Sequence, residues 1–433
     1  MKILFLDTEP IRRGAQVFIS ELSSFLGQKG ETCKVLYLYK IKNSDHKNLS
    51  NSDTKKVLEG DKASVFERIP GINPALMKRL IFELKEYSPD VIVCNGSRTL
   101  KYAAVAKLFY HKEARWIARW IDDAAFWNPN IVSKWIYENV IMSQFDGCIG
   151  VSQASLDSMI RHYNFKKPTQ VIHRAFDPKK FQHAPSREEA RRNLGFKESD
   201  EVLLFLGNLT SQKRPDRFIE IVQKLAQTRP NLKALLVGDG PLRKELEGEL
   251  LKDNYQSSKI EEGNQSADTQ ETSDENSSDS QPPSSVNQHP TSDTRHPTCD
   301  TRHPTPDTRH QTPTISFTGY QQDVSAYLAA ADILLLTSDT EGLPGVVLEA
   351  AYFAVPTVAT EVGGIAECLI DGETGVLVSD RSVTQFCKRL NHLLDHPAER
   401  VRMGESAQIF TDKNFKMERV ARQYVDFFKQ LLQ

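Results

Sequence analysis

The sequence predicts an α/β fold with two doubly wound, Rossmann-like domains that face each other across a cleft. Three observations predict it. Short apolar runs alternate with amphipathic helical patterns, the alternation restarts near residue 201, and the stretch between the two halves is polar and contains Pro178 and Pro185. Such alternation is typical of a parallel sheet covered by helices on both faces. We therefore expect domains at 1–176 and 201–413, joined by a linker at 177–200.

Each element rests on a local pattern. In the first half, apolar runs predict strands at 2–7, 33–39, 89–96, 114–122, 146–152 and 169–173. Helical spacing there predicts helices at 15–30 and 74–87. In the second half, we expect strands at 201–208, 232–240, 314–319, 332–338, 356–360 and 375–379. Helices are expected at 215–227, 241–253 and 344–355, and a last helix at 414–433.

Composition places the chain among globular proteins. Its 433 residues are 39% hydrophobic and 26% charged, and its six cysteines form no C-x-x-C pair. Scattered cysteines are typical of reduced thiols in a cytoplasmic protein. The first apolar run is short and meets Asp7, so we expect no signal peptide, and no run approaches the 18 apolar residues of a membrane span.

The charge is unevenly distributed. Residues 1–176 hold 26 Lys and Arg against 18 Asp and Glu, a balance of +8, whereas residues 177–433 hold 29 against 39, a balance of −10. A basic half favours anionic partners, which include a membrane surface, and the helix at 74–87 suits a lipid-linked acceptor. The alternatives are an ordinary solvated surface and a helix whose apolar stripe faces the core.

One segment contains too few apolar residues to form a core. Residues 254–312 contain five apolar residues, and their end repeats a seven-residue unit that carries His289, His296, His303 and His310. So little apolar surface does not offset the entropy of ordering, which predicts a disordered insertion. A metal-binding histidine tract is the alternative, but the intervening prolines keep the histidines apart, and we expect no metal site.

Two acids flank a turn rich in Gly and Pro. Glu341 follows the strand at 332–338, and Glu349 lies inside the helix that begins near Pro344. A helix N-terminus stabilises a diphosphate, and carboxylates accept hydrogen bonds from sugar hydroxyls. The two acids therefore suit the two sugars of a nucleotide sugar. The alternatives are a capping-region acid with a solvated helix residue, or the acid pair of a glycosidase.

Three further signals favour the nucleotide sugar. Lys213 lies in the loop after the strand at 201–208, where a lysine can neutralise a phosphate leaving group. Gly363 and Gly364 follow the strand at 356–360 and allow close backbone approach. Gly14 lies in the first loop of the first domain, across the predicted cleft.

Together these stretches resemble the retaining glycosyltransferases of family four, which have the GT-B fold. The resemblance covers most of the chain outside 254–312. It rests on RRGAQVF, FDGCIGVSQAS, LGNLTSQKRPD, LVGDGPLR, FTGYQQD, EGLPGVVLEA and TEVGGIAE, in that order. It implies that the helix at 414–433 crosses back to the first domain.

The resemblance also implies roles for particular residues. Lys213 would contact the diphosphate, Glu341 the donor sugar and Glu349 the ribose, while Gly14 would give the phosphate or the acceptor access to the backbone. The matching motifs add a set of donor-binding positions: Asn208, Gly319, Tyr320, Gly342, Leu343, Pro344 and Gly345. Lys213, Glu341 and Asp122 are the residues expected to act in catalysis.

Three positions depart from the family pattern. Asn208 stands where an arginine usually partners the lysine, and Asp122, followed by Asp123, stands where many members have a histidine. His173, Arg174 and Ala175 replace the usual Pro-Asn-Gly. Arg174 could supply the missing cation. Asp122 and Asp123 could bind acceptor hydroxyls or could form a simple turn.

The sequence thus predicts a metal-independent glycosyltransferase that takes a nucleotide sugar and a saccharide or lipid-linked acceptor. No cofactor and no nucleic acid are expected, and the chain is expected in the cytoplasm, with contact to the membrane face as a further expectation. The alternatives are a catalytically inactive protein that binds nucleotide sugars or glycans, and a nucleotide-sugar epimerase. The donor sugar, its base, the acceptor and the oligomeric state do not follow from the sequence.

Overall fold

The computed structural model describes residues 1–10, 14–40, 54–60, 71–110, 112–124, 130–250 and 314–433. Residues 1–242 and 313–433 form one compact unit, and residues 243–312 form a second one. Of the second unit, residues 243–250 are described, and they are helical. The predicted insertion at 254–312 and its histidine repeat lie outside the described residues.

The first sheet has seven parallel strands in the order β3-β2-β1-β4-β5-β6-β7. The strands are β1 (Lys2–Asp7), β2 (Thr32–Tyr39), β3 (Lys55–Gly60), β4 (Val91–Asn95), β5 (Arg115–Trp120), β6 (Gly147–Gly150) and β7 (Thr169–Val171). The strand β3 is absent from the sequence-based prediction. Because it is an edge strand with a charged sequence, KKVLEG, it lacks the continuous apolar run of a buried parallel strand.

The second sheet has six parallel strands in the order β10-β9-β8-β11-β12-β13. The strands are β8 (Glu201–Leu206), β9 (Leu232–Val237), β10 (Thr314–Gly319), β11 (Ile333–Leu336), β12 (Thr357–Thr360) and β13 (Gly375–Val378). All six were predicted from apolar runs, within a few residues. The predicted fold class, with two doubly wound sheets, is confirmed.

Helices cover both faces of the first sheet because successive side chains of each strand point to opposite faces. Leu4 and Leu6 pack with one set of helices, whereas Ile3 and Phe5 pack with another. The first set comprises α3 (Pro74–Tyr87), α4 (Ser97–Phe109), the short helices η1 (Tyr137–Ile141) and η2 (Met142–Gln144), and α7 (Gln153–Tyr163). The helix α6 (Ile131–Ile136) precedes η1 and has no buried residue. The second set comprises α1 (Gly14–Gln28) and α15 (Met417–Leu432).

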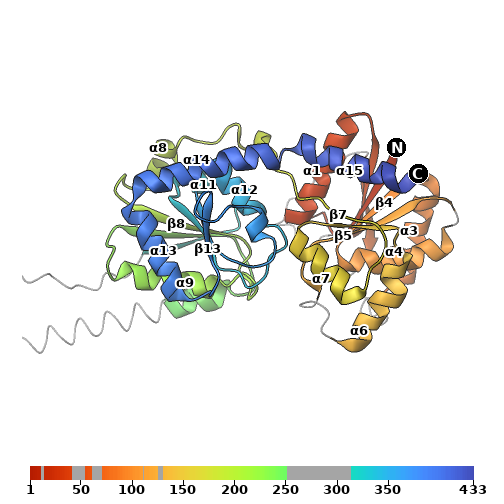
Figure 1. Ribbon diagram of the computed structural model, residues 1–433, viewed down its shortest axis with the longest axis horizontal. Coiled ribbons are helices and arrows are strands. Elements are labelled where there is room, and N and C mark those ends of the chain that lie inside the picture. Colours follow the sequence, from red (N-terminus) through yellow and green to blue (C-terminus); the bar gives the residue numbers. More distant parts are fainter. Residues whose placement is uncertain (11–13, 41–53, 61–70, 111, 125–129, 251–313) are drawn as a thin grey trace, which may run out of the picture. The chain divides into compact units, whose positions relative to one another are not determined.

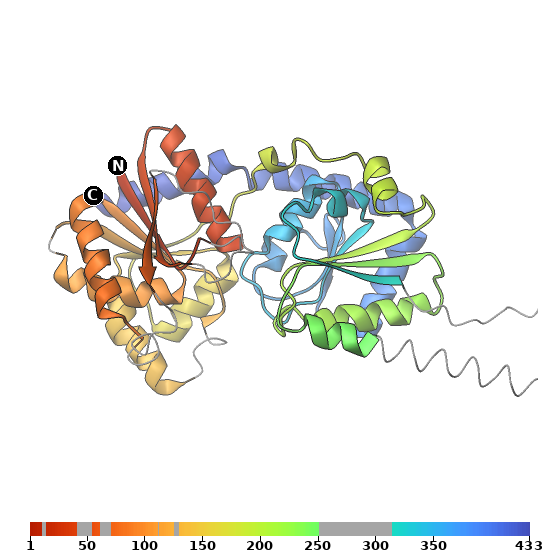
Figure 2. The same ribbon diagram turned by 180° about the vertical axis from the view of Figure 1, so that it is seen from behind.

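The second sheet is covered in the same way (Figure 1). One face carries α11 (Ser325–Ala330) and α12 (Gly345–Tyr352), with α8 (Arg187–Asn193) and α14 (Pro397–Asn414) packed on them. The other carries α9 (Pro215–Ala226) and α13 (Val383–Asp395). Figure 2 shows the same separation from behind. The remaining elements are the short helices η3 (Pro178–Phe181) and η4 (Ile365–Glu367).

The C-terminal helix α15 returns to the first sheet, as predicted, and a buried polar network holds it there. Arg119 on β5 donates to the hydroxyl of Tyr424 at 3.0 Å and to the side-chain oxygen of Asn95 at 2.7 Å. Its guanidinium also lies 4.8 Å from the ring centroid of Phe18. Asn95 in turn donates to Asp7 at 2.7 Å. The network therefore joins α1, α15 and three strands of one sheet.

The sequence also led to expectations about the cysteines, membrane-spanning segments and domain boundaries. The five cysteines within the described ranges are free and buried, whereas Cys299 lies outside those ranges. Among the described residues, no helix combines the length and the apolarity needed to cross a bilayer. The domain boundaries at 176 and 200 stay a prediction.

The raised pKa of Asp7 predicts a pH dependence of stability. Burial raises the pKa of Asp7 from 3.8 to about 6, although hydrogen bonds from Asn95, Thr8 and Gln16 oppose this rise. Between these two values the folded protein holds a proton that the unfolded chain has lost, so this group destabilises the fold as pH rises. Asp7→Asn should remove this effect. Relative to the parent, its free energy of unfolding should rise by about 3 kcal/mol between roughly pH 4 and pH 7, at about 1.4 kcal/mol per pKa unit.

Urea unfolding of both proteins at several pH values measures this difference. Asp426→Asn on the exposed side of α15 is the control, and its difference from the parent should stay flat. A flat difference for Asp7→Asn as well would contradict the proposed cost of ionising Asp7.

Candidate active site

Lys213 and Glu341 meet where the order of the second sheet reverses. Lys213 follows β8 and Glu341 follows β11, and these strands are neighbours although β9 and β10 separate them in the chain. The loops after two such strands diverge, which opens the crevice in which doubly wound sheets bind their ligands. Nζ of Lys213 contacts both carboxylate oxygens of Glu341, at 2.5 and 2.6 Å.

The two partners differ in their access to solvent. The Glu341 side chain is 6% exposed, whereas that of Lys213 is 29% exposed. The hydroxyl of Ser338 also donates to Glu341, at 2.7 Å. A buried carboxylate needs such partners because its desolvation is otherwise uncompensated. Glu341 is therefore fixed in place, and Lys213 is the partner that can exchange its contact for a ligand from solvent.

Backbone packing places the turn that carries Glu341. A Cβ atom on Gly342 would lie 2.0 Å from the carbonyl oxygen of Ile121, and one on Gly364 would lie 2.0 Å from the carbonyl oxygen of Gly342. A Cβ on Gly363 would lie 1.7 Å from the carbonyl oxygen of Glu341. Three loops therefore touch backbone to backbone, and side chains at these glycines would force them apart.

Asp122 lies just beyond β5 and belongs to the same electrostatic group. Burial and the charge of Glu341 raise the pKa of Asp122, Asp123 adds to the effect, and Lys213 opposes it. The indole N–H of Trp120 donates to the backbone carbonyl of Asp122 at 2.6 Å. The structure thus brings together the three residues that the sequence singled out for catalysis. Their roles stay predictions.

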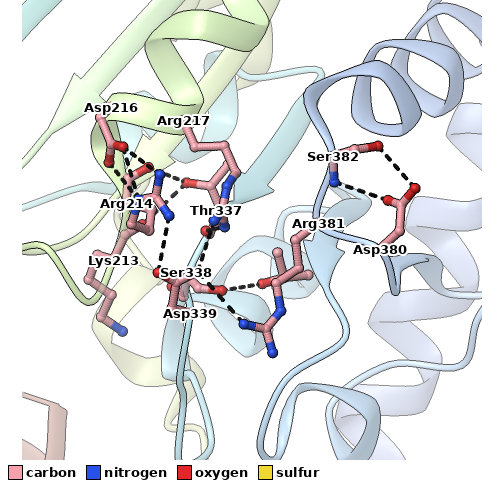
Figure 3. Close-up of polar contacts among 11 residues, drawn as sticks. Lys213, Arg214, Asp216, Arg217, Thr337, Ser338, Asp339, Asp380, Arg381 and Ser382 are labelled. Carbon is pink, nitrogen blue, oxygen red and sulfur yellow. Dashed lines mark hydrogen bonds and ion pairs between the residues drawn. The ribbon is translucent and has the colours of Figure 1, made fainter.

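A network that sequence reasoning missed anchors the loops behind Lys213 (Figure 3). Arg214 contacts both Asp216 and Asp339, and Arg217 donates to Asp339 at 2.9 Å and to the carbonyl of Thr337 at 2.6 Å. Burial alone would raise the pKa of Asp339, but the hydrogen bonds from Arg217 and Arg214 outweigh it and lower this pKa. In Figure 3 the Lys213 side chain points away from this cluster. The charged sequence KRPD at 213–216 was the local signal from which this network could have been predicted.

Arg174 lies between the first residues of α1 and α12. A Cβ atom on Gly345 would lie 2.2 Å from its Nη1, and one on Gly14 would lie 2.8 Å from the same atom. Its Nε is buried and has no hydrogen-bond partner among the described residues. Pro344 precedes α12 and provides no side-chain cap. Two helix N-termini and a guanidinium therefore converge, and this arrangement favours an anion.

Glu349 lies one turn into α12 and is half-buried. Burial raises the pKa of Glu349, while the charges of Lys180 and Arg174 oppose the rise and Glu21 adds to it. Lys180 also forms an ion pair with Glu21, at 2.7 Å. The carboxylate of Glu349 therefore lies near two cations that the sequence did not connect with it, because they belong to distant parts of the chain.

The other predicted donor-binding residues lie at or near the carboxyl ends of the second sheet's strands. Asn208 is exposed after β8, and Tyr320 is 40% exposed after β10. Gly319 has a φ of +70°, and its carbonyl accepts from the backbone N–H of Gly238 at 2.9 Å. Leu343 is buried in the core of the second sheet. Their contacts with a donor stay predictions.

A cavity of about 600 Å³ opens beside Glu341. Its walls come from α6, α7 and the loops after β5, β11, β12 and β13, and both charge signs are present. The lining residues are Asp123, Lys134, Ala154, Ser155, Asp157, Ser158, Arg161, His162, Asp339, Thr340, Glu341, Glu361, Val362, Gly363 and Arg381. Within the described ranges, no group of three or more His, Cys, Asp or Glu could hold a metal ion.

Glu367 joins the loops around this cavity. Its carboxylate accepts from the backbone N–H groups of Gln153 and Ala154, at 2.8 and 3.2 Å, at the start of α7. It also contacts Nε2 of His173 at 2.9 Å. Burial would raise the pKa of Glu367, but His173 and the two N–H groups lower it. The TEVGGIAE stretch had pointed only to its glycines, since nothing local indicates a partner more than 190 residues away.

Three family profiles match successive parts of the chain. Residues 12–180 match "Glycosyltransferase Family 4". Residues 186–266 and 300–396 match two profiles that are both described as "Glycosyl transferases group 1". The matches follow the order of the two predicted domains and leave out residues 1–11, 181–185, 267–299 and 397–433.

Curated relatives and solved structures agree with these profiles. The chain is 32% identical over 114 residues to the "Vi polysaccharide biosynthesis protein VipC/TviE" of Salmonella typhi, covering 26% of this chain and 20% of the relative. It is 24% identical over 280 residues to a "D-inositol 3-phosphate glycosyltransferase" of Streptomyces avermitilis, covering 64% and 51%. The chain thus spans between a fifth and about half of the length of these relatives. The crystal structure of Anabaena Alr3699/HepE with UDP and glucose has the same fold, with a TM-score of 0.70 at 17% identity over 99% of this chain and 100% of that one.

Gly363 gives a direct test of the backbone packing. Gly363→Ala should cost much more stability than Gly372→Ala, although both glycines have a positive φ, of 55° and 74°. A Cβ on Gly372 meets nothing within 4 Å, so that variant should lose roughly 1–2 kcal/mol from backbone strain alone. Gly363→Ala adds the collision with Glu341. Urea unfolding measures both losses, and equal losses would show that the contact is not tight.

Proposed function

Because the chain belongs to the glycosyltransferases of group 1 and family 4, we propose that it transfers a sugar from a nucleotide sugar to a saccharide or lipid-linked acceptor, with retention at the anomeric carbon. The Lys213–Glu341 pair at the reversal of the second sheet carries this proposal. It supplies a cation and a hydroxyl acceptor side by side. The name of the Salmonella relative favours a polysaccharide product.

The diphosphate would bind at the start of α12. Arg174 and the N-termini of α1 and α12 supply positive charge there. Arg174 takes the place of the family's arginine, where this chain has Asn208. Glu349, one turn further along, would accept hydrogen bonds from the ribose. The Anabaena structure was solved in complex with UDP and glucose, which supports a donor that contains a nucleoside diphosphate.

The reaction moves charge onto the diphosphate. The bond between the anomeric carbon and the diphosphate oxygen breaks, the bond from the acceptor oxygen forms, and the acceptor's proton leaves with the phosphate or solvent. Negative charge grows on the leaving oxygen, which Lys213 would stabilise as a preorganised cation. When Lys213 turns to the phosphate, Glu341 becomes free to accept a hydroxyl of the donor sugar. We propose that this step needs no metal ion.

Asp122 would bind the acceptor. It lies close enough to Glu341 for their charges to interact, and burial raises its pKa. A carboxylate at this position can accept hydrogen bonds from the hydroxyls of an acceptor. The adjacent cavity of about 600 Å³ offers room for a sugar unit. The acceptor would thus approach from the α6 and α7 side.

A panel of nucleotide sugars tests the function. The full chain is incubated with uridine-, guanosine- and adenosine-diphosphate sugars, with and without EDTA, and products are separated by chromatography. A transferase should slowly hydrolyse one donor in both conditions. Interconversion of the sugars would instead indicate an epimerase, and a thermal shift without turnover an inactive binding protein. Activity that EDTA abolishes and magnesium or manganese restores would contradict the metal-independent reaction.

The two acids should separate binding from turnover. Glu349→Ala should weaken nucleoside diphosphate binding by roughly 10- to 150-fold, since a hydrogen bond to a charged group contributes about 1.5–3 kcal/mol. Glu341→Ala should bind the diphosphate almost normally and turn over slowly. Titration calorimetry and steady-state rates measure the two effects, with Glu373→Ala, an exposed acid on the turn before β13, as the control. Parental behaviour of both variants would refute the assignment.

Lys213 should contribute most to the chemical step. Lys213→Ala should lower turnover by about a hundredfold or more, the scale that follows the loss of one preorganised donor, and should weaken diphosphate binding as well. Lys213→Arg keeps a cation beside Glu341 and should retain more activity. Lys197→Ala, which removes an exposed lysine before β8, is the control. Asn208→Arg should keep or raise activity. Near-parental turnover of Lys213→Ala would identify Lys213 as a structural residue.

A further inference from the structure

Three cationic side chains line the cavity beside Glu341. Lys134 comes from α6, Arg161 from α7 and Arg381 from the turn between β13 and α13. Over the ranges that the structure describes, the side chains of Lys134 and Arg161 have neither a hydrogen bond nor an ion pair. Arg381 lies 3.9 Å from Asp339, which is too far for a hydrogen bond. All three cations therefore keep N–H donors for a ligand.

The acids of the same cavity take their partners from elsewhere. Both oxygens of Asp339 accept hydrogen bonds from arginines behind the cavity wall, and both oxygens of Glu341 contact its lysine partner. Asp123 accepts from a serine hydroxyl at 2.5 Å, and Asp157 from a glutamine amide at 2.7 Å. Glu361 is exposed, and its carboxylate has no partner among the described residues. Five acids thus line the cavity, yet none of them forms a hydrogen bond with one of its three cations.

The backbone at Arg381 is strained and held in place. Its φ of +56° lies in the left-handed region, which is unfavourable for a residue with a Cβ atom. Asp380 accepts from both the backbone N–H and the hydroxyl of Ser382, each at 3.0 Å (Figure 3). Ser382 in turn caps α13 by accepting from the N–H of Gln385. Strain of this kind gathers at sites that bind ligands, and here it places a guanidinium in the cavity wall.

Resting on the proposed function, we propose that the acceptor carries a negatively charged group, a carboxylate or a phosphate, which Lys134, Arg161 and Arg381 bind together. The flat fork of an arginine matches two oxygens of either group, and a lysine adds a point charge. Because the acids of the wall leave these cations unpaired, the charged acceptor oxygens come from the ligand. The cavity of about 600 Å³ holds a sugar unit that bears such a group.

This site is separate from the one proposed for the diphosphate of the donor. Arg174, at the starts of α1 and α12, is not among the residues that line the cavity. Glu341 does line it, so an anion held by the three cations keeps the rest of the acceptor in the space beside Glu341. A bound nucleoside diphosphate therefore leaves the cavity open, and the two anions bind independently.

Titration calorimetry of the full chain with matched sugars tests the acceptor charge. The sugars are glucose, glucuronate and glucose 6-phosphate, and the same three forms of galactose. Each is titrated in the presence of whichever of uridine, guanosine and adenosine diphosphate binds most tightly, at a saturating concentration that fills the site at Arg174. At least one anionic form should bind about tenfold or more tightly than its neutral sugar, and salt should weaken this binding. Comparison of the two anionic forms distinguishes a carboxylate from a phosphate.

Two variants assign the binding to the cavity. Arg161→Gln and Arg381→Gln should each weaken binding of the anionic sugar by about 10- to 150-fold, the scale of one hydrogen bond to a charged group. Both should bind the neutral sugar and the nucleoside diphosphate like the parent, which shows that they are folded. Arg402→Gln is the matched control, because this arginine is exposed on α14 and does not line the cavity.

Two outcomes would overturn the proposal. The neutral sugars could bind as tightly as their anionic forms, or Arg161→Gln and Arg381→Gln could both bind the anionic sugar like the control variant. Binding of the three nucleoside diphosphates alone is measured first, which separates this proposal from the transferase function. If none of them binds, the proposed function fails, whereas binding of an anionic sugar that both variants lose would still support the anion site.

Discussion

The ion pair between Lys213 and Glu341 is the interaction on which the site depends. It joins the ends of β8 and β11, the two strands at which the order of the second sheet reverses. Glu341 is almost closed off from water, so its charge needs Lys213 or a ligand in its place. In the proposed function, ligand binding is an exchange of partners, in which a diphosphate takes Lys213 while a sugar hydroxyl satisfies Glu341.

Two kinds of contact hold this pair in position. Behind Lys213, the cluster of Arg214, Arg217 and Asp339 fixes the loops after β8 and β11. Around Glu341, glycines allow three backbones to touch, and one of these backbones, at Ile121, belongs to the loop after β5 of the first sheet. The placement of Asp122 beside Glu341 follows from this contact. Residues that carry no chemistry therefore help to hold the Lys213–Glu341 pair in place.

The positive end of the site is also assembled from distant segments. Arg174 comes from the stretch after β7, whereas the helix starts at Gly14 and Gly345 lie at opposite ends of the chain. In this arrangement Arg174 brings a cation to the two helix N-termini. On the first sheet, the buried Arg119 holds α15 through Tyr424, so the C-terminal helix is anchored to β5, the strand that Asp122 follows.

The sequence by itself determined the elements with strong local patterns. Eleven of the thirteen described strands coincide with predicted apolar runs to within two residues at each end. The run predicted for β9 extends three residues beyond the strand, and β3 is absent from the prediction. The order of these elements was enough for the fold class, because alternating strands and helices permit few topologies. The motifs also singled out Lys213 and Glu341, and a departure from the family pattern singled out Asp122; their roles stay predictions.

Only the tertiary structure decided which of these residues meet. Glu341 and Lys213 are 128 positions apart, and His173 and Glu367 are 194 apart. Such contacts leave no periodic trace in the chain, since they depend on strand order and on how closely loops approach.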